Sequence, residues 1–235
     1  GTVSMRLKRW DMALQAFTEV VQQEPEEGDA WANVAAIHMH NKQPSEAYPA
    51  LNEALKYQRN SWRIWVSKLY TCLDLEKYDE AIQACNMLMD LRDQRGASDN
   101  IPPLEEKCVR AIVGGSIERL NESRGDDAAM ESARRSLSRV HTLLERINSS
   151  GSSQSWILDA LTFFHDQVGK DEKVLEYLMQ EYRALQSIPG WEKDKFLVKK
   201  LTDNVLHVTT IHEQRGTKDQ ITKARFLVRG VLRRI

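Results

Sequence analysis

Apolar residues recur along most of this chain at steps of three and four, the spacing of one face of an α-helix. The clearest run contains six apolar positions, namely Met130, Ala133, Leu137, Val140, Leu144 and Ile147. No stretch shows the sustained two-residue alternation of a half-buried β-strand. The pattern therefore predicts an all-α protein.

The first part of the chain adds a longer period of 34 residues. Trp31 and Trp65 are one period apart, and the same step joins three alanines, Ala13, Ala47 and Ala81. Each alanine is followed four residues later by Phe17, Leu51 or Cys85, and seven residues later by Val20, Ala54 or Leu88. A period of this length is typical of stacked helix hairpins, with one hairpin in each repeat.

The residue types at these positions have a physical reason. A small alanine lets the second helix of a hairpin approach the first closely, and the residues four and seven further on fill the seam on the same face. The tryptophan near the start of a first helix supplies a large apolar wedge. Asp11, Ser45 and Asp79 each precede an alanine by two residues, and we expect their side-chain oxygens to cap the second helices.

The pattern places the second helix of a first, cut repeat at 10–22, and full repeats at 29–57 and 62–92. Later helices are expected at 103–122, through 130–147, and at 155–168, 171–187, 192–214 and 217–233. Polar or Ser/Gly-rich stretches at 94–100 and 149–155 are expected to be linkers. Trp156, Ala160 and Phe163 are spaced like a repeat's first helix, but the second helix of that hairpin does not keep the register.

Two regions follow from this pattern. Residues 1–95 are expected to form the repeats, and residues 101–235 a helical, repeat-like C-terminal extension. Gly1 stands where the first helix of a repeat is already half built. We therefore expect the first repeat to be truncated and the chain to be a fragment of a longer protein.

The repeated positions resemble the tetratricopeptide repeat. The match runs through Ala13–Phe17–Val20–Pro25, then Trp31–Val34–Ala35–His38–Ala47–Leu51–Ala54, then Trp65–Leu69–Cys72–Ala81–Cys85–Leu88. Ala35 and Leu69 stand where the family usually has glycine, and Lys68 where leucine is usual. The resemblance implies a right-handed superhelix of antiparallel helix pairs, whose first helices line a concave groove for a peptide or a partner helix.

In this register the groove-facing candidates are Asp29, Asn33, Ala36, His40, Arg63, Ser67, Tyr70 and Asp74. One tetratricopeptide subfamily holds the C-terminal carboxylate of chaperones with a clamp of lysine, asparagine and arginine. Asn33 matches the asparagine of that clamp, and Arg63 replaces a lysine. Ser67 stands where the clamp needs arginine, and the clamp positions of the first repeat are either Thr2 or missing. The alternative is that Asn33 and Arg63 are ordinary residues of a solvated face.

Composition narrows the function classes. The net charge of the 235 residues is −1, so no overall attraction to nucleic acid or membrane is expected. Cys72, Cys85 and Cys108 lack the CxxC spacing and are expected to be small buried side chains in a reducing compartment. A cytoplasmic location, with the nucleus as a second compartment, is the corresponding expectation.

No pattern of catalytic or metal-binding residues emerges from the sequence. The histidine pairs His38/His40 and His207/His212 lack the HExxH spacing of a zinc site. Gly114-Gly115 has neither the strand nor the lysine of a phosphate-binding loop, and is better explained by close packing of two helices. We therefore expect no enzyme, no cofactor and no metal.

The C-terminus is basic, because residues 191–235 contain eleven Lys/Arg and five Asp/Glu, a net charge of +6. Arg225, Arg229, Arg233 and Arg234 are spaced to lie near one helical face. This basic patch is either a solvated face or a docking surface for an acidic protein or RNA. No aromatic platform for base stacking is interleaved with it, so nucleic acid is not the expected partner.

The sequence thus predicts an intracellular scaffold that binds protein segments, with chaperones among the expected partners. A closer resemblance to one member of the family implies a co-chaperone role in assembling large complexes, including the U5 particle of the spliceosome. The alternative is a module that binds RNA or an acidic partner through the basic C-terminal helices.

Overall fold

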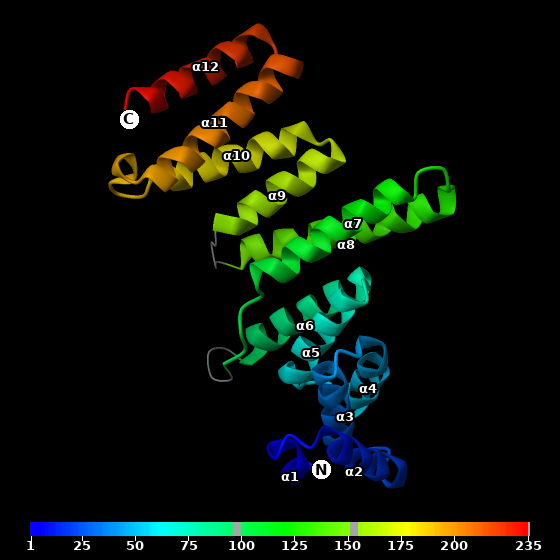
Figure 1. The fold of residues 1–235 in the computed structure, drawn as a ribbon. Helices are drawn as coiled ribbons and strands as arrows, with labels where there is room; N and C mark the ends of the chain where they lie inside the picture. Colours follow the sequence, from blue (N-terminus) through cyan, green and yellow to red (C-terminus); the bar gives the residue numbers. More distant parts are fainter. Residues whose placement is uncertain (96–99, 151–154, 235) are drawn as a thin grey trace. The chain divides into compact units, whose positions relative to one another are not determined.

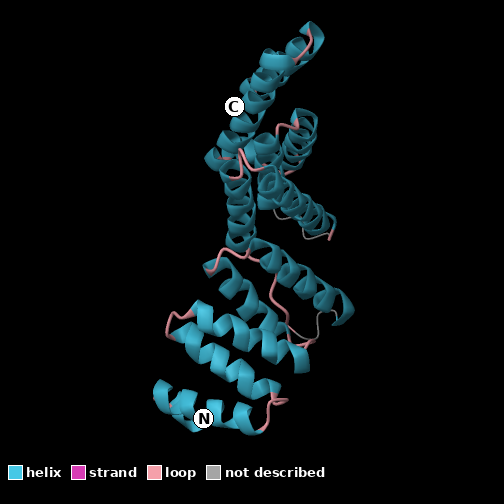
Figure 2. Cartoon of the chain, turned by 90° about the vertical axis from the view of Figure 1, so that its right-hand side faces the viewer, coloured by secondary structure: helices cyan, strands magenta, loops and turns pink. Residues whose placement is uncertain are grey.

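The computed structural model describes residues 1–95, 100–150 and 155–234, and these residues are helical with connecting turns (Figure 2). The chain divides into two compact units, Gly1–Leu143 and Leu144–Ile235, which we call unit 1 and unit 2. This division concerns compactness, whereas the predicted boundary between 95 and 101 concerns sequence repeats and stays a prediction. The predicted linkers at 94–100 and 149–155 lie largely outside the described residues.

The helices follow one another without strands over the described residues (Figure 1). In order they are α1 (Thr2–Arg6), α2 (Trp10–Gln23), α3 (Gly28–His40), α4 (Pro44–Tyr57), α5 (Trp62–Asp74), α6 (Tyr78–Arg95), α7 (Glu106–Glu122), α8 (Asp127–Ser149), α9 (Ser155–Val168), α10 (Asp171–Gln186), the 3₁₀ turn η2 (Trp191–Lys193), α11 (Lys195–Arg215) and α12 (Lys218–Leu232). The all-α prediction is confirmed. The predicted helix 192–214 is divided in the structure into η2 and α11. Asp194 follows η2 and caps α11, where its side chain accepts hydrogen bonds from the Phe196 and Leu197 amides.

Unit 1 is built from antiparallel hairpins, in which α3 pairs with α4 and α5 with α6, while α2 packs on α3 and α4 on α5 (Figure 1). The three period-defining alanines, Ala13, Ala47 and Ala81, are all 0% exposed. Leu51 and Cys85 are buried as predicted. Val20 is an exception, because it is exposed while its neighbour Val21 is buried in the same turn of α2.

The two tryptophans at the period of 34 make the same bond. Trp65 Nε1 donates to the main-chain oxygen of Arg59 at 2.7 Å, and Trp31 Nε1 donates to that of Pro25 at 2.9 Å. In both repeats the acceptor lies six residues earlier, in the turn before the first helix. The tryptophan therefore fixes that turn as well as filling the seam.

The predicted caps Asp11, Ser45 and Asp79 are wrong. Each second helix begins at the residue before the predicted cap, so the three predicted caps lie within the first turn of their helices. The N-cap residues of α2 and α4 are Arg9 and Gln43, and neither makes a side-chain cap bond. Asp11 and Asp79 still place a negative charge at the helix start, which favours the helix dipole.

The turn inside each hairpin explains why the second helix begins before the predicted cap residue. Lys8, Lys42 and Glu76, again 34 residues apart, adopt left-handed backbone with φ near 57°. The amide of the residue after each one bonds the carbonyl oxygen five residues earlier, at 2.8–2.9 Å. This bond closes a standard motif at the C-terminus of a helix, in which glycine usually occupies the left-handed position. None of the three positions holds glycine, so the turn left no signal in the sequence.

Unit 2 contains the same turn between α9 and α10. Gly169 takes the left-handed position with φ of 72°, and the amide of Lys170 bonds the carbonyl oxygen of His165 at 2.9 Å. Counted from this turn, Val174 and Leu178 occupy the places of Ala47 and Leu51. The second helix therefore keeps the register when it is counted from the turn. It does not keep it when counted from Trp156, as predicted, because extra residues lie between Trp156 and the turn.

The core of unit 2 is apolar between α10, α11 and α12. One cluster joins Leu185, Trp191, Leu201, Val205 and Val231, and a second joins Val174, Leu178, Val208 and Ala224. The α11–α12 pair begins its second helix with a capping box, since Thr217 and Gln220 bond each other's main-chain amides. Each of these contacts lies within unit 2.

Two packing predictions are confirmed. Cys72, Cys85 and Cys108 are buried and free, and burial raises the pKa of the Cys72 thiol to about 12. A Cβ added at Gly115 would lie 1.9 Å from the Tyr78 ring, so this glycine permits close approach of α6 and α7. Within residues 1–95, 100–150 and 155–234, none of the helices combines the length and apolar character needed to cross a membrane.

Candidate functional site

The predicted groove of unit 1 begins on α3. The Asp29 carboxylate accepts a bond from Gln58 Nε2 at 2.7 Å, and Asn33 Nδ2 donates to the main-chain oxygen of Asp29 at 2.8 Å. The ring of His40, at the far end of α3, lies 4.1 Å from the ring of Trp10. These polar residues are therefore held by contacts within α3 and with its neighbours α2 and α4.

The second half of the predicted groove lies on α5. Arg63 is exposed, with its guanidinium 5.4 Å from the Trp62 ring centre. The Tyr70 hydroxyl donates to the Glu105 carboxylate at 2.6 Å, and Lys107 Nζ lies 2.8 Å from the same carboxylate. Lys107 and then Tyr70 lower the pKa of Glu105. Tyr70 thus binds the segment that precedes α7.

Helices α3 and α5 contact each other, so the two sets of residues belong to neighbouring first helices. Ser67 is half-buried and Asp74 is exposed. Among the described residues, no hydrogen bond or ion pair links the α3 set to the α5 set. The groove assignment therefore remains a prediction about which face a partner contacts.

The predicted basic patch lies on α12 and the residues that follow it. Arg225, Arg229, Arg233 and Arg234 are all exposed, and the Arg225 guanidinium is paired with Glu213 at 3.1 Å. One aromatic residue, Phe226, does lie between the arginines of the patch. Phe226 is 63% exposed, and the Arg229 guanidinium lies 6.0 Å from its ring centre.

Sequence reasoning missed a polar cavity in unit 2. It has a volume of about 380 Å³ and is lined by residues of α9, α10 and α11. The polar and aromatic lining residues are Asp159, Thr162, Phe163, Asp166, Glu181, Lys200, Asp203, Asn204 and His207. No part of the 34-residue period extends to this region, so the period could not have indicated it.

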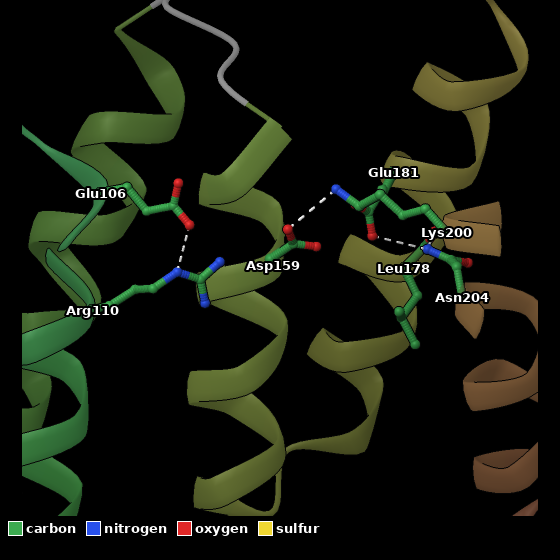
Figure 3. Close-up of polar contacts among 7 residues, drawn as sticks. All are labelled: Glu106, Arg110, Asp159, Leu178, Glu181, Lys200 and Asn204. Carbon is green, nitrogen blue, oxygen red and sulfur yellow. Dashed lines mark hydrogen bonds and ion pairs between the residues drawn. The ribbon is translucent and has the colours of Figure 1, made fainter. Parts of the chain in front are cut away.

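The centre of the cavity is an ion-pair network (Figure 3). Lys200 Nζ lies 2.7 Å from Glu181 Oε1 and 3.1 Å from Asp159 Oδ2. Asn204 Nδ2 donates to Glu181 Oε2 at 3.1 Å and to the main-chain oxygen of Leu178 at 2.9 Å. The network thus joins α9, α10 and α11 through buried or half-buried side chains.

Burial and charge act against each other at this network. Burial raises the pKa of Glu181, and the neighbouring Asp159 carboxylate adds to the rise against the lowering effect of Lys200. Burial alone would lower the pKa of Lys200, but its bonds to Glu181 and Asp159 raise it overall. Lys200 therefore stays charged and is shared between two carboxylates.

Two atoms around the cavity lack partners in the structure. Asn204 Oδ1 and Thr162 Oγ1 are shielded from solvent and accept or donate no hydrogen bond, in side chains that are 5% and 8% exposed. Such an atom costs about 1–3 kcal/mol of folding free energy. A sequence signal did exist, since Glu181 interrupts the apolar stripe that Val174 and Leu178 begin on α10.

Comparison with known proteins gives the family context. The family model described as tetratricopeptide repeat matches residues 4–69. The chain is 22% identical over 252 aligned residues to the tetratricopeptide repeat-containing protein trd-1 of Caenorhabditis elegans, covering 100% of this chain and 32% of that protein. It is 26% identical over 180 aligned residues to the tetratricopeptide repeat protein 27 homolog of Dictyostelium discoideum, covering 77% of this chain and 20% of that protein.

The chain thus spans a third or less of the length of these relatives. Among solved structures, one described as YrrB, a TPR protein with an unusual peptide-binding site, aligns with a TM-score of 0.45 and 10% identity over 93% of each chain. The closer resemblance to one family member is to tetratricopeptide repeat protein 27, and it is carried by the run Ala30–His38 and by Trp62–Trp65. A homolog of that protein is among the relatives found. The family model thus matches the part of the chain in which the 34-residue period predicted tetratricopeptide repeats.

Proposed function

We propose that this chain is a non-enzymatic scaffold for protein–protein interaction, and that α3 and α5 present the contact surface of unit 1. The observation that carries the proposal is the contrast between the two sides of these helices. Ala35, Ile37 and Cys72 are fully buried on the packed side, whereas Asp29, His40 and Arg63 are exposed on the other. An exposed row of polar and charged residues on adjacent first helices suits an extended peptide or a partner helix.

The partner class is the finer part of the proposal. The resemblance to tetratricopeptide repeat protein 27 supports a chaperone-linked role in the assembly of large complexes, with the U5 spliceosomal particle as the candidate complex. The carboxylate clamp is a narrower possibility, because Asn33 uses one amide hydrogen on its own helix while Arg63 is exposed to solvent. Since the chain spans only part of the length of its relatives, this role is proposed for a whole protein of that kind, of which this chain would form one part.

A tagged form of the chain, used as bait in a cell lysate and read by mass spectrometry, tests the unit 1 surface. The Asn33→Ala/Arg63→Ala variant should lose chaperones or complex-assembly proteins that the unaltered chain captures. Glu46→Ala/Lys56→Ala is the matched control, because both residues are exposed on α4, a second helix. Equal capture by all three baits would contradict the assignment of the groove to α3 and α5.

A second candidate is the basic patch of α12, which the exposed Phe226 beside Arg229 favours. A base can stack on an exposed aromatic ring while arginines contact phosphates. If the patch binds single-stranded RNA, affinity should fall steeply with salt, and Phe226→Ala should weaken it about tenfold. Binding that ignores both salt and Phe226 would leave the patch as a solvated face.

A further inference from the structure

The cavity of unit 2 has an unusual charge distribution for its size. Four carboxylates line it, Asp159, Asp166, Glu181 and Asp203, against Lys200 and the imidazole of His207. Lys200 is already shared between Glu181 and Asp159. The exposed carboxylates, Asp166 and Asp203, therefore give the open side of the cavity a negative character, even though residues 191–235 as a whole are basic.

The orientation of Asn204 is fixed by its surroundings. Its Nδ2 donates to Glu181 Oε2 and to the Leu178 main-chain oxygen, and a carbonyl oxygen can only accept. Rotating the amide would place two acceptors against each other, so Oδ1 must be the atom without a partner. Thr162 Oγ1, on α9, is in the same situation. Both residues line the cavity, and a ligand carrying N–H donors would satisfy both atoms.

The rim adds an apolar component. Phe163 lines the cavity and is 46% exposed, next to Thr162 on α9. An aromatic ring beside carboxylates is a favourable contact for the methylene stem of a lysine or for a guanidinium. The larger cavity of unit 1, between α6 and α8, differs because, over the described residues, none of its lining residues has a buried polar atom without a partner.

We propose that this cavity binds a lysine- or arginine-bearing segment of a partner protein. The cationic head group contacts Asp166 and Asp203, its stem lies against Phe163, and amide hydrogens of the segment reach Asn204 Oδ1 and Thr162 Oγ1. An anionic ligand is disfavoured, because the only ammonium in the lining is neutralised by two carboxylates. The site is separate from the unit 1 groove and does not depend on the function proposed there.

A fluorescein-labelled peptide of alternating lysine and leucine provides a direct test with the 235-residue chain, measured by fluorescence anisotropy. We expect saturable binding that weakens with salt, and no binding of the same peptide with glutamate in place of lysine. Asp166→Asn/Asp203→Asn should weaken binding about tenfold or more, since a tenfold change corresponds to only about 1.4 kcal/mol. Asp219→Asn/Glu172→Gln is the matched control, because it makes the same charge change in unit 2 away from the cavity.

Thr162→Val separates binding from folding. Valine has the shape of threonine without the unpartnered hydroxyl, so the variant should melt at the same temperature or higher while binding the peptide about threefold to tenfold more weakly. A Thr162→Val chain with unchanged affinity, or equal affinity for both charge variants, would overturn the proposal. Failure of the lysine peptide to bind would also overturn it, as would complete competition by free spermidine at equal concentration, which would indicate a site for small cations.

Discussion

The hairpins α3–α4 and α9–α10 share a turn but differ at one position after it. Counted from the left-handed residue of the turn, Ala54 and Glu181 are equivalent, twelve residues later in each hairpin. Ala54 is 0% exposed in an apolar seam, whereas Glu181 is 4% exposed and paired with Lys200. The same hairpin geometry thus supports either a small-residue seam or a buried polar network.

The comparison shows what the 34-residue period records. Alanine at the seam permits the closest helix approach, so the repeats of unit 1 hold their spacing through side-chain size. In unit 2, Val174 replaces the alanine and Glu181 replaces the small apolar residue. A buried ion pair adds little net stability.

The largest effect is expected from filling the seam of unit 1. Ala47→Leu adds three carbons at a position with 0% exposure, and should lower the free energy of unfolding by about 3 kcal/mol. Ala184→Leu on α10 is the control, because that alanine is exposed and the change should be nearly neutral. Chemical denaturation of both variants measures the difference, and similar losses would contradict a size-determined seam.

Removing one charge from the polar network of unit 2 should destabilise the protein in a way that depends on pH. Lys200→Met leaves the buried Glu181 without its cation and should cost about 2 kcal/mol, below the range for fully buried pairs because the Lys200 side chain is 19% exposed. The loss should shrink between pH 8 and pH 5. Glu181 already has a raised pKa, so the folded state of the variant binds a proton more tightly than the unfolded state as the pH falls.

The double variant Lys200→Met/Glu181→Leu sharpens this result, because it removes both charges. Its stability should return to that of the unaltered chain or exceed it. Thermal unfolding at pH 8 of the two single variants and the double variant measures the coupling. Additive losses would show that the two side chains act independently.

A smaller effect separates two adjacent glycines of α7. Gly115→Ala places a Cβ 1.9 Å from the Tyr78 ring and should destabilise unit 1 by about 1–3 kcal/mol. Gly114→Ala meets nothing within 4 Å and should stabilise the helix by about 1 kcal/mol. Denaturation midpoints that move in the same direction for both variants would contradict the close approach of α6 and α7.

The smallest effect concerns the Tyr70–Glu105 contact beside the predicted groove. Lys107 and Tyr70 lower the pKa of Glu105 from 4.5, so its stabilising contribution is present above that value and is lost as the pH falls through the folded-state pKa. Glu105→Gln should therefore show a weaker decrease in melting temperature between pH 6 and pH 3 than the unaltered chain. Parallel melting curves would indicate that the contact contributes nothing measurable.

The sequence predicted those parts of the fold that depend on apolar spacing. Ala13, Ala47 and Ala81 specify the hairpins directly, and the six-position run from Met130 to Ile147 lies within α8. The helix caps were wrongly assigned to Asp11, Ser45 and Asp79 because the turn uses lysine and glutamate at left-handed positions, which carry no glycine signal. Local propensity cannot show a conformation that tertiary packing imposes.

The unit 2 site was not predicted from the sequence, for a different reason. Asp159, Glu181 and Lys200 come from three helices and are widely separated in sequence, so only the packing of α9, α10 and α11 brings them together. The unit 1 groove residues follow from the repeat register alone. Their contacts, such as Tyr70 with Glu105, depend on a segment outside the repeats and required the structure.

Hydrogen exchange of the 235-residue chain, with and without the lysine–leucine peptide, tests most directly whether the polar network of unit 2 is a binding site distinct from the unit 1 groove. Bound peptide should slow exchange in residues 159–166 and 200–207 and leave residues 29–40 and 63–74 unchanged. Protection confined to unit 1, or protection that persists in Asp166→Asn/Asp203→Asn, would contradict this account.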